Sequence, residues 1–181
     1  MAGKKSCIAV IPFGTSPKAV LEAIAAAISM HLGTSAEILP PIENPSHTFD
    51  PVRLQYNAAG IIKTLETKAL PAYWKVLGVL TVDLFLPVFT HVFGEAREGG
   101  KCAIISLYRL SKDEGSSESE GSTAERAAKV ALHELAHLFN VTHCTDRNCL
   151  MHFSMNLREL DEMPMEFCQY CRAFLAGNLK R

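Results

Sequence analysis

The chain has 181 residues, of which 48% are hydrophobic, and its 18 basic residues nearly balance its 19 acidic ones. This composition predicts one compact domain with a sizeable core and argues against a nucleic-acid partner or a polybasic membrane surface. The apolar run at residues 7–11 is too short for a signal peptide, and the run at 76–89 is too short to span a bilayer. We therefore expect a cytoplasmic protein that does not enter a membrane.

The first 39 residues predict a strand, a helix and a second strand. Residues 5–12 are an apolar run typical of a strand. Ser16 followed by Pro17 predicts the N-cap and first turn of a helix that continues to residue 32, and Gly33 predicts its end. A strand at 36–39 would then pair in parallel with the first one, because a helical crossover joins them.

A second helix is expected at residues 58–69, capped by Asp50 or a nearby residue and ended by Pro71. Residues 74–86 contain the strongest strand signal of the chain. This run is apolar on both faces, which is typical of the buried middle of a sheet.

Two further strands are predicted at residues 88–95 and 102–108. The polar run at 111–122 cannot contribute to a core. Residues 122–125, Ser-Thr-Ala-Glu, match a capping box, which predicts a helix over 123–139.

These elements predict an α/β (α+β) fold, with a mixed twisted sheet and flanking helices above an active-site helix. A small, irregular C-terminal part follows, closed by a short helix at 172–179. We expect residues 1–140 and 141–181 to form two subdomains of a single compact domain.

The predicted helix over 123–139 contains the motif His133-Glu134-x-x-His137. Histidines four residues apart share one face of a helix and suit two corners of a zinc tetrahedron. Glu134 lies beside them as a general base, and His143 follows at a distance that lets the chain turn back with a third imidazole. The alternative, a polar surface helix, fits poorly because the residues between and after the histidines are mostly apolar.

Asn140 lies where the chain has to turn so that His143 can reach the metal. Asparagine follows only glycine in its tolerance of the positive φ that ends many helices. An ordinary asparagine cap predicts the same geometry, so Asn140 agrees with the metal site without proving it.

Four of the six cysteines are clustered late in the chain and form two pairs, Cys144 with Cys149 and Cys168 with Cys171. Four thiolates at this spacing are typical of a closed, structural zinc site. A redox pair and free thiols are the alternatives. Cys7 and Cys102 are expected to be buried free thiols.

A methionine beneath a zinc site provides an apolar, adaptable floor. Met151 is the favoured candidate because it closely follows Cys149, and plain core packing is the alternative. Its competitors are Met155, Met163 and Met165.

Together these motifs resemble the archaemetzincins, a family of metzincin zinc metallopeptidases. The resemblance is carried by the histidine motif, by the spacing of the four cysteines and Met151, and by the stretches 79–84, 93–96 and 106–110. It implies a catalytic zinc on His133, His137 and His143, Glu134 as general base, Met151 as the methionine of the turn under the metal, and a structural zinc on Cys144, Cys149, Cys168 and Cys171. It also implies an intracellular enzyme without a pro-segment. Asn140 departs from the pattern, since metzincins usually have glycine there.

The sequence thus predicts a monomeric peptidase that binds two zinc ions and hydrolyses peptide bonds through a zinc-bound water activated by Glu134. A peptide or protein substrate would lie extended along an exposed strand, for which residues 91–96 are the candidate. One alternative is an amidase or other zinc hydrolase acting on a small molecule. Another is a non-catalytic, zinc-stabilised interaction module.

Overall fold

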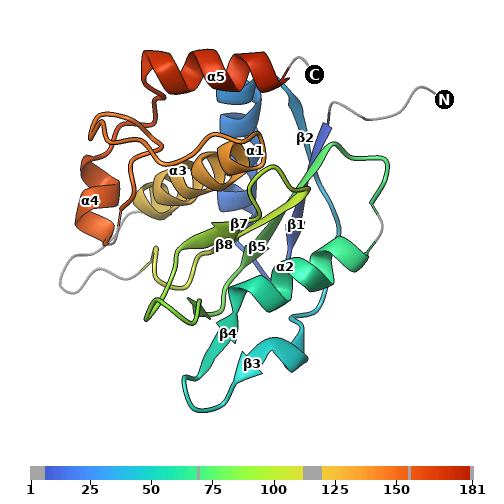
Figure 1. The fold of residues 1–181 in the computed structure, drawn as a ribbon. Helices are drawn as coiled ribbons and strands as arrows, with labels where there is room; N and C mark the ends of the chain where they lie inside the picture. Colours follow the sequence, from blue (N-terminus) through green and yellow to red (C-terminus); the bar gives the residue numbers. More distant parts are fainter. Residues whose placement is uncertain (1–6, 69, 112–119, 155, 180–181) are drawn as a thin grey trace.

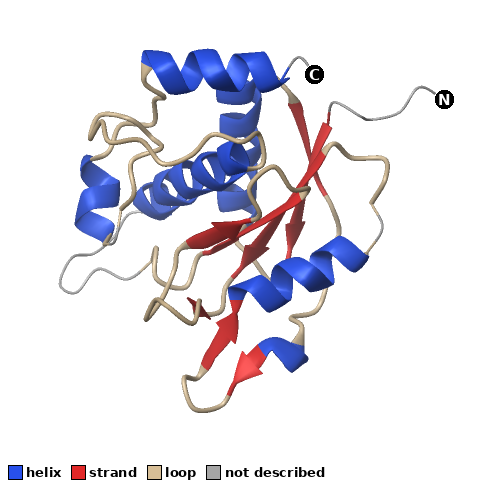
Figure 2. Ribbon diagram, viewed as in Figure 1, coloured by secondary structure: helices blue, strands red, loops and turns tan. Residues whose placement is uncertain are grey.

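The computed structural model describes residues 7–68, 70–111, 120–154 and 156–179. Its main sheet has five strands in the order β2-β1-β5-β8-β7 (Figures 1 and 2). The bounds are Cys7–Pro12 for β1, Ser35–Ile38 for β2, Lys75–Leu80 for β5, Gly94–Ala96 for β7 and Cys102–Ser106 for β8. The first four in this order pair in parallel, and β7 is antiparallel to β8. The predicted mixed α/β fold is confirmed.

Helices cover both faces of this sheet (Figure 1). Along β1, Ile8 and Val10 pack in the cluster that contains the apolar residues of α1 (Lys18–Leu32) and α3 (Glu120–His137). The alternate residues Ala9 and Ile11 pack with α2 (Ala58–Thr67). Because neighbouring side chains of a strand point to opposite faces, a strand that is apolar throughout is buried on both sides.

Several short elements were not predicted. Strands β3 (Phe49–Asp50), β4 (Gln55–Asn57) and β6 (Leu84–Phe85) form a second, three-stranded sheet, and η1 (Ser46–Thr48) precedes it. The short helix α4 (Leu157–Glu162) follows α3. The closing helix α5 (Gln169–Leu179), in contrast, was expected and begins three residues earlier than predicted. Elements of two to six residues have too little periodicity to be recognised in a sequence.

Two predicted helix caps are wrong. The N-cap of α1 is Pro17, without a side-chain cap hydrogen bond, so Ser16 does not cap this helix. The cap of α2 is Asn57, whose side chain accepts a hydrogen bond from the backbone N–H of Gly60. Asp50 instead accepts hydrogen bonds in the turn that follows β3. Each of these residues can cap a helix or a turn, and tertiary packing decides which.

Other predicted bounds also shift. Helix α3 begins at Glu120 rather than at residue 123, so the predicted capping box lies inside it, and α2 ends at Thr67. The strand expected at 88–95 is limited to β7. Residues 112–119 of the polar run lie outside the described residues. None of the helices in the described parts of the chain is both long and apolar enough to cross a membrane.

Candidate active site and cysteine cluster

The two histidines of the motif lie on one face of α3, as predicted. This helix packs against α1 and against β7 and β8. Leu135 and Ala136, between the histidines, are fully buried and hold the helix against the core. His133 and His137 therefore face the other way, and their Nε2 atoms are 3.1 Å apart.

The second nitrogen of each ring binds a backbone carbonyl. His133 Nδ1 lies 2.8 Å from the carbonyl oxygen of Leu150, and His137 Nδ1 lies 2.7 Å from that of Val141. A carbonyl only accepts hydrogen bonds, so each Nδ1 must carry the proton and donate it. Both Nε2 atoms then offer lone pairs to the same point, which is the arrangement expected of histidine ligands to a metal.

The turn after α3 delivers the third histidine. Asn140 has a positive φ of 63°, and its N–H donates to the carbonyl of His137. The centroid of the His143 ring lies 5.2 Å from the ring centroid of His133 and 4.8 Å from that of His137. One nitrogen from each of the three rings lies within 4.8 Å of the other two. The predicted turn at Asn140 is thus present, although α3 itself ends at His137 and not at residue 139.

Burial keeps these imidazoles neutral. It lowers the pKa of His133 to about 3, with a smaller contribution from neighbouring His137. The pKa values of His137 and His143 are also lowered, mainly by burial. Neutral imidazole is the form that binds zinc, so the donor set fits this metal.

Glu134 is buried beside the histidines and packs against β7. A Cβ atom on Gly94 would lie only 2.6 Å from Cγ of Glu134, so this strand can approach the carboxylate closely only because residue 94 is glycine. Burial raises the pKa of Glu134 well above its ordinary value, and the charge of nearby Glu95 raises it further. A perturbed carboxyl in this setting is typical of a general acid or base.

A cavity of about 370 Å³ opens over these groups. Its lining includes the three histidines, Glu134 and residues 89–96. Strand β7 is the last strand of the main sheet and pairs only with β8 among the described strands, so its other edge lies beside the cavity. The predicted edge segment at 91–96 does line the cavity, although only residues 94–96 of it are strand.

The four late cysteines form a second cluster. Their sulfur atoms lie within 4.8 Å of one another, although they come from two distant parts of the chain. Backbone N–H groups of Met151 and Cys168 donate to the sulfur of Cys149, and that of Cys171 donates to the sulfur of Cys168. Hydrogen bonds, above all the one from the Cys171 N–H, lower the pKa of the Cys168 thiol to about 7. Four thiols held in this way fit a tetrahedral zinc.

Hydrogen bonds join the two clusters. The N–H of Cys144 donates to the carbonyl of Met151, and the N–H of Leu150 donates to the carbonyl of Glu166. The carbonyl of Leu150 in turn accepts from His133. Met151 is fully buried in this segment. Among its competitors, Met163 is also buried and lines the cavity, Met165 is partly buried, and Met155 lies outside the described residues.

Comparison with known proteins identifies the family. The family model for peptidase family M54 matches residues 24–177. The chain belongs to peptidase family M54. It is 34% identical over 188 aligned positions to the archaemetzincin of Pyrococcus furiosus, covering 98% of this chain and 96% of that protein.

Solved structures agree with this assignment. The crystal structure of archaemetzincin from Methanopyrus kandleri superposes with a TM-score of 0.88 at 32% identity, covering 100% of this chain and 99% of that one. A zinc-dependent peptidase from Methanocorpusculum labreanum gives 0.83 at 28% identity, covering 93% and 99%. The protein is therefore a zinc metallopeptidase of the archaemetzincin family, as its motifs predicted.

Some residues around the cavity were not singled out from the sequence. Phe89, Phe153 and Glu98 line it, and Lys129 reaches it from α3. No local pattern marks these positions, because they come from three separate parts of the chain that only the fold brings together. Gly94 lay within the predicted edge segment, but its contact with Glu134 could not be read from the spacing.

Proposed function

We propose that this chain hydrolyses peptide bonds at the three-histidine cluster, with Glu134 as the general base. The observation that carries the proposal is the convergence of three neutral imidazoles beside one buried carboxyl group, under an open cavity. A site with three protein ligands leaves one position of a zinc tetrahedron for substrate or water.

His133, His137 and His143 would hold the catalytic zinc. When bound there, zinc lowers the pKa of water and polarises a carbonyl group. The backbone carbonyls of Leu150 and Val141 keep two of the rings in the required tautomer. Glu134 accepts a proton in its ionised form and passes that proton on to the leaving amine. Its buried position favours holding the proton between these two steps.

Cys144, Cys149, Cys168 and Cys171 would hold a second zinc with a structural role, giving two zinc ions per chain. Four sulfur ligands leave no position for a substrate, so such an ion contributes to folding and not to chemistry. Met151 would provide the apolar floor beneath the histidine site, since it is fully buried directly after Leu150.

The substrate would be a peptide bound in an extended conformation along β7. The backbone groups on the free edge of this strand can pair with an added strand, which gives affinity without sequence specificity. Smaller amides need no such edge, and this favours a peptidase over an amidase acting on small molecules.

Zinc analysis and a cleavage assay test the proposal together. We expect two zinc ions per purified chain, cleavage of members of a peptide library, and at least a hundredfold lower rate in Glu134→Ala, the size typical of losing general-base catalysis. Glu22→Ala, at an exposed position on α1, serves as the control.

Three outcomes would contradict parts of the proposal. Unchanged cleavage in Glu134→Ala would refute the assigned base. A single zinc held only by cysteines would favour the non-catalytic module, and hydrolysis of small amides without any peptide cleavage would favour the amidase. The subdomain division at residue 140, the monomeric state and the cytoplasmic location stay predictions.

A further inference from the structure

Two aromatic side chains line the cavity from opposite segments of the chain. Phe89 lies in the segment before β7, and Phe153 follows Met151. Their ring centroids are 6.1 Å apart, and the side chains are 38% and 43% exposed. The Phe153 ring also lies 5.1 Å from the ring of His143. We call Phe89 and Phe153 the aromatic ledge, since they extend a row of rings outward from the third histidine.

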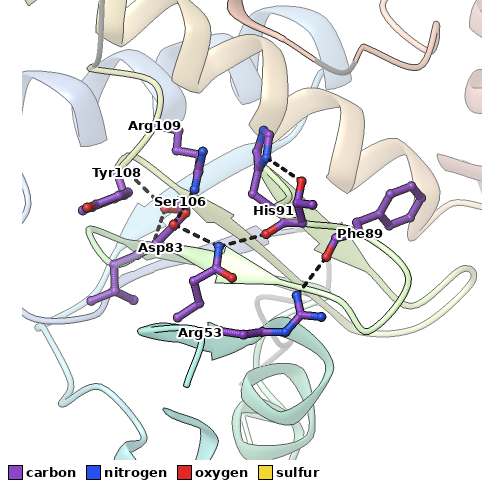
Figure 3. A network of polar contacts seen from close by, with 10 residues as sticks. Arg53, Asp83, Phe89, His91, Ser106, Tyr108 and Arg109 are labelled. Carbon is purple, nitrogen blue, oxygen red and sulfur yellow. Dashed lines mark hydrogen bonds and ion pairs between the residues drawn. The ribbon is translucent and has the colours of Figure 1, made fainter. Parts of the chain in front are cut away.

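The backbone of Phe89 is held in place although its segment has no regular secondary structure. Arg53 Nη1 donates to the carbonyl of Phe89 at 3.2 Å, and the N–H of Phe89 donates to the carbonyl of Leu86. Gln55 Nε2 donates to the next carbonyl, that of Thr90. Figure 3 shows the bond from Arg53 to the Phe89 carbonyl and the Phe89 ring pointing away from it. Arg53 and Gln55, just before and at the start of β4, therefore hold the backbone that carries Phe89.

Further polar contacts hold Gln55 and Arg53 in place. Asp83 accepts hydrogen bonds from Gln55 and, through both carboxylate oxygens at 2.7 Å, from Arg109 (Figure 3). A two-point pairing between a guanidinium and a carboxylate fixes orientation as well as distance. The guanidinium of Arg53 also lies over the ring of Phe85, 4.5 Å from its centroid.

Phe153 is fixed from the cysteine cluster. The preceding residue, His152, donates its N–H to the carbonyl of Cys149, and its ring nitrogen Nδ1 lies 3.1 Å from the carbonyl of Cys144. The backbone beside each aromatic residue is thus held by hydrogen bonds, while a large part of each side chain remains exposed. Aromatic side chains that are ordered before binding lose little entropy when a ligand covers them.

We propose that the aromatic ledge selects peptides that carry a large apolar side chain, preferably aromatic, next to the cleaved bond. The inference rests on the proposed function and adds a substrate class to it. The two rings of the ledge present no charge, so a charged substrate side chain placed against them would lose hydration without gaining a polar contact from the rings. A phenyl ring would bury the exposed ring faces and gain the tilted ring contacts that aromatic groups prefer.

Matched peptides that differ only in one residue beside the cleaved bond provide the test. We expect the wild-type enzyme to cleave the phenylalanine peptide with a kcat/KM about 10-fold higher than the alanine peptide, and still higher than the aspartate peptide. Phe89→Ala and Phe153→Ala should each remove most of this preference, measured as the ratio of the kcat/KM values for the phenylalanine and alanine peptides. Phe153→Leu keeps an apolar side chain and should keep an intermediate preference.

Two further variants separate the ledge from general effects. Phe174→Ala removes an exposed phenylalanine on α5, away from the cavity lining, and should leave the preference unchanged. Arg53→Met removes the donor to Phe89 and should raise KM for the phenylalanine peptide with little change in kcat. Zinc content and melting temperature are measured for every variant to confirm folding.

Binding of the same fluorescently labelled peptides to zinc-loaded Glu134→Gln gives a readout that does not depend on turnover. Equal affinity for the phenylalanine and alanine peptides, or an unchanged preference in both ledge variants, would overturn the ledge while leaving the proposed chemistry intact. Cleavage unaffected by Glu134→Ala would contradict the proposed chemistry and leave the ledge standing if the binding preference persists.

Discussion

Asn140 shows how one residue links the end of a helix to a candidate metal site. It adopts φ 63° at the end of α3, and a Cβ atom on Gly99 would lie only 2.5 Å from its side-chain oxygen Oδ1. The N–H of Gly99 donates to the carbonyl of His137, so the turn before β8 packs directly on the helix end. The positive φ was predictable from the motif, whereas this packing depends on a glycine far away in the chain.

Replacing Asn140 separates these effects. Asn140→Gly should keep zinc affinity at the histidine site, because glycine adopts positive φ without strain. Asn140→Val should lower that affinity about tenfold, since a left-handed conformation costs roughly 1–2 kcal/mol in a residue with a Cβ atom, and more when it is branched. Competition with a zinc-binding dye measures the zinc affinity of each variant. Equal affinities in the two variants would contradict the role given to the positive φ of Asn140.

At the scale of elements, the segment after α3 is central to both clusters, although it has little regular secondary structure. It provides His143, the carbonyls that orient the other two histidines, and the cysteine pair that joins it to α5. The sequence predicted candidate metal ligands on this segment but not the short α4, which contributes Leu160 to the cavity lining. Ligand spacing is local, whereas the path of an irregular segment is set by its long-range hydrogen bonds.

Removing one cysteine tests whether the second cluster supports the first. Cys171→Ser should lower the zinc content from two ions to one and reduce the melting temperature. It should also weaken zinc binding at the histidines about 10-fold, which is the lower end of the loss in affinity expected when a group that supports metal ligands is removed. Elemental analysis, thermal denaturation and zinc titration measure these effects. Cys7→Ala, outside both clusters, should retain two ions. Full zinc affinity at the histidines in Cys171→Ser would show that the two sites are independent.

At the scale of the whole molecule, the proposed role of Glu134 in catalysis opposes the stability of the fold. Folding removes Glu134 from water, and burial raises its pKa in the folded metal-free protein. Near pH 4 and below, the carboxyl is protonated in both the folded and the unfolded state, so its ionisation does not change the free energy of unfolding. At higher pH the unfolded chain releases the proton while the folded one retains it, and stability falls until the pH passes the folded pKa.

Glu134→Gln should therefore stabilise the metal-free protein. After chelation of zinc, its melting temperature should exceed that of the wild type by an amount that grows between about pH 4 and pH 7. The exposed substitution Glu22→Gln should give no such trend. Melting curves recorded across this pH range check the prediction, and a difference that is independent of pH would be evidence against it.

By itself, the sequence determined the fold class, the parallel pairing of the first two strands, the helix with both motif histidines, and the family. These features depend on residue spacing along single elements, where periodicity and ligand chemistry act within a few residues. Only the tertiary structure decided that Asn57 rather than Asp50 caps α2, that Gly94 packs on Glu134, and that Phe89 meets Phe153. Each of these depends on groups far apart in the chain, and long-range packing chooses among partners that the local sequence leaves equally available.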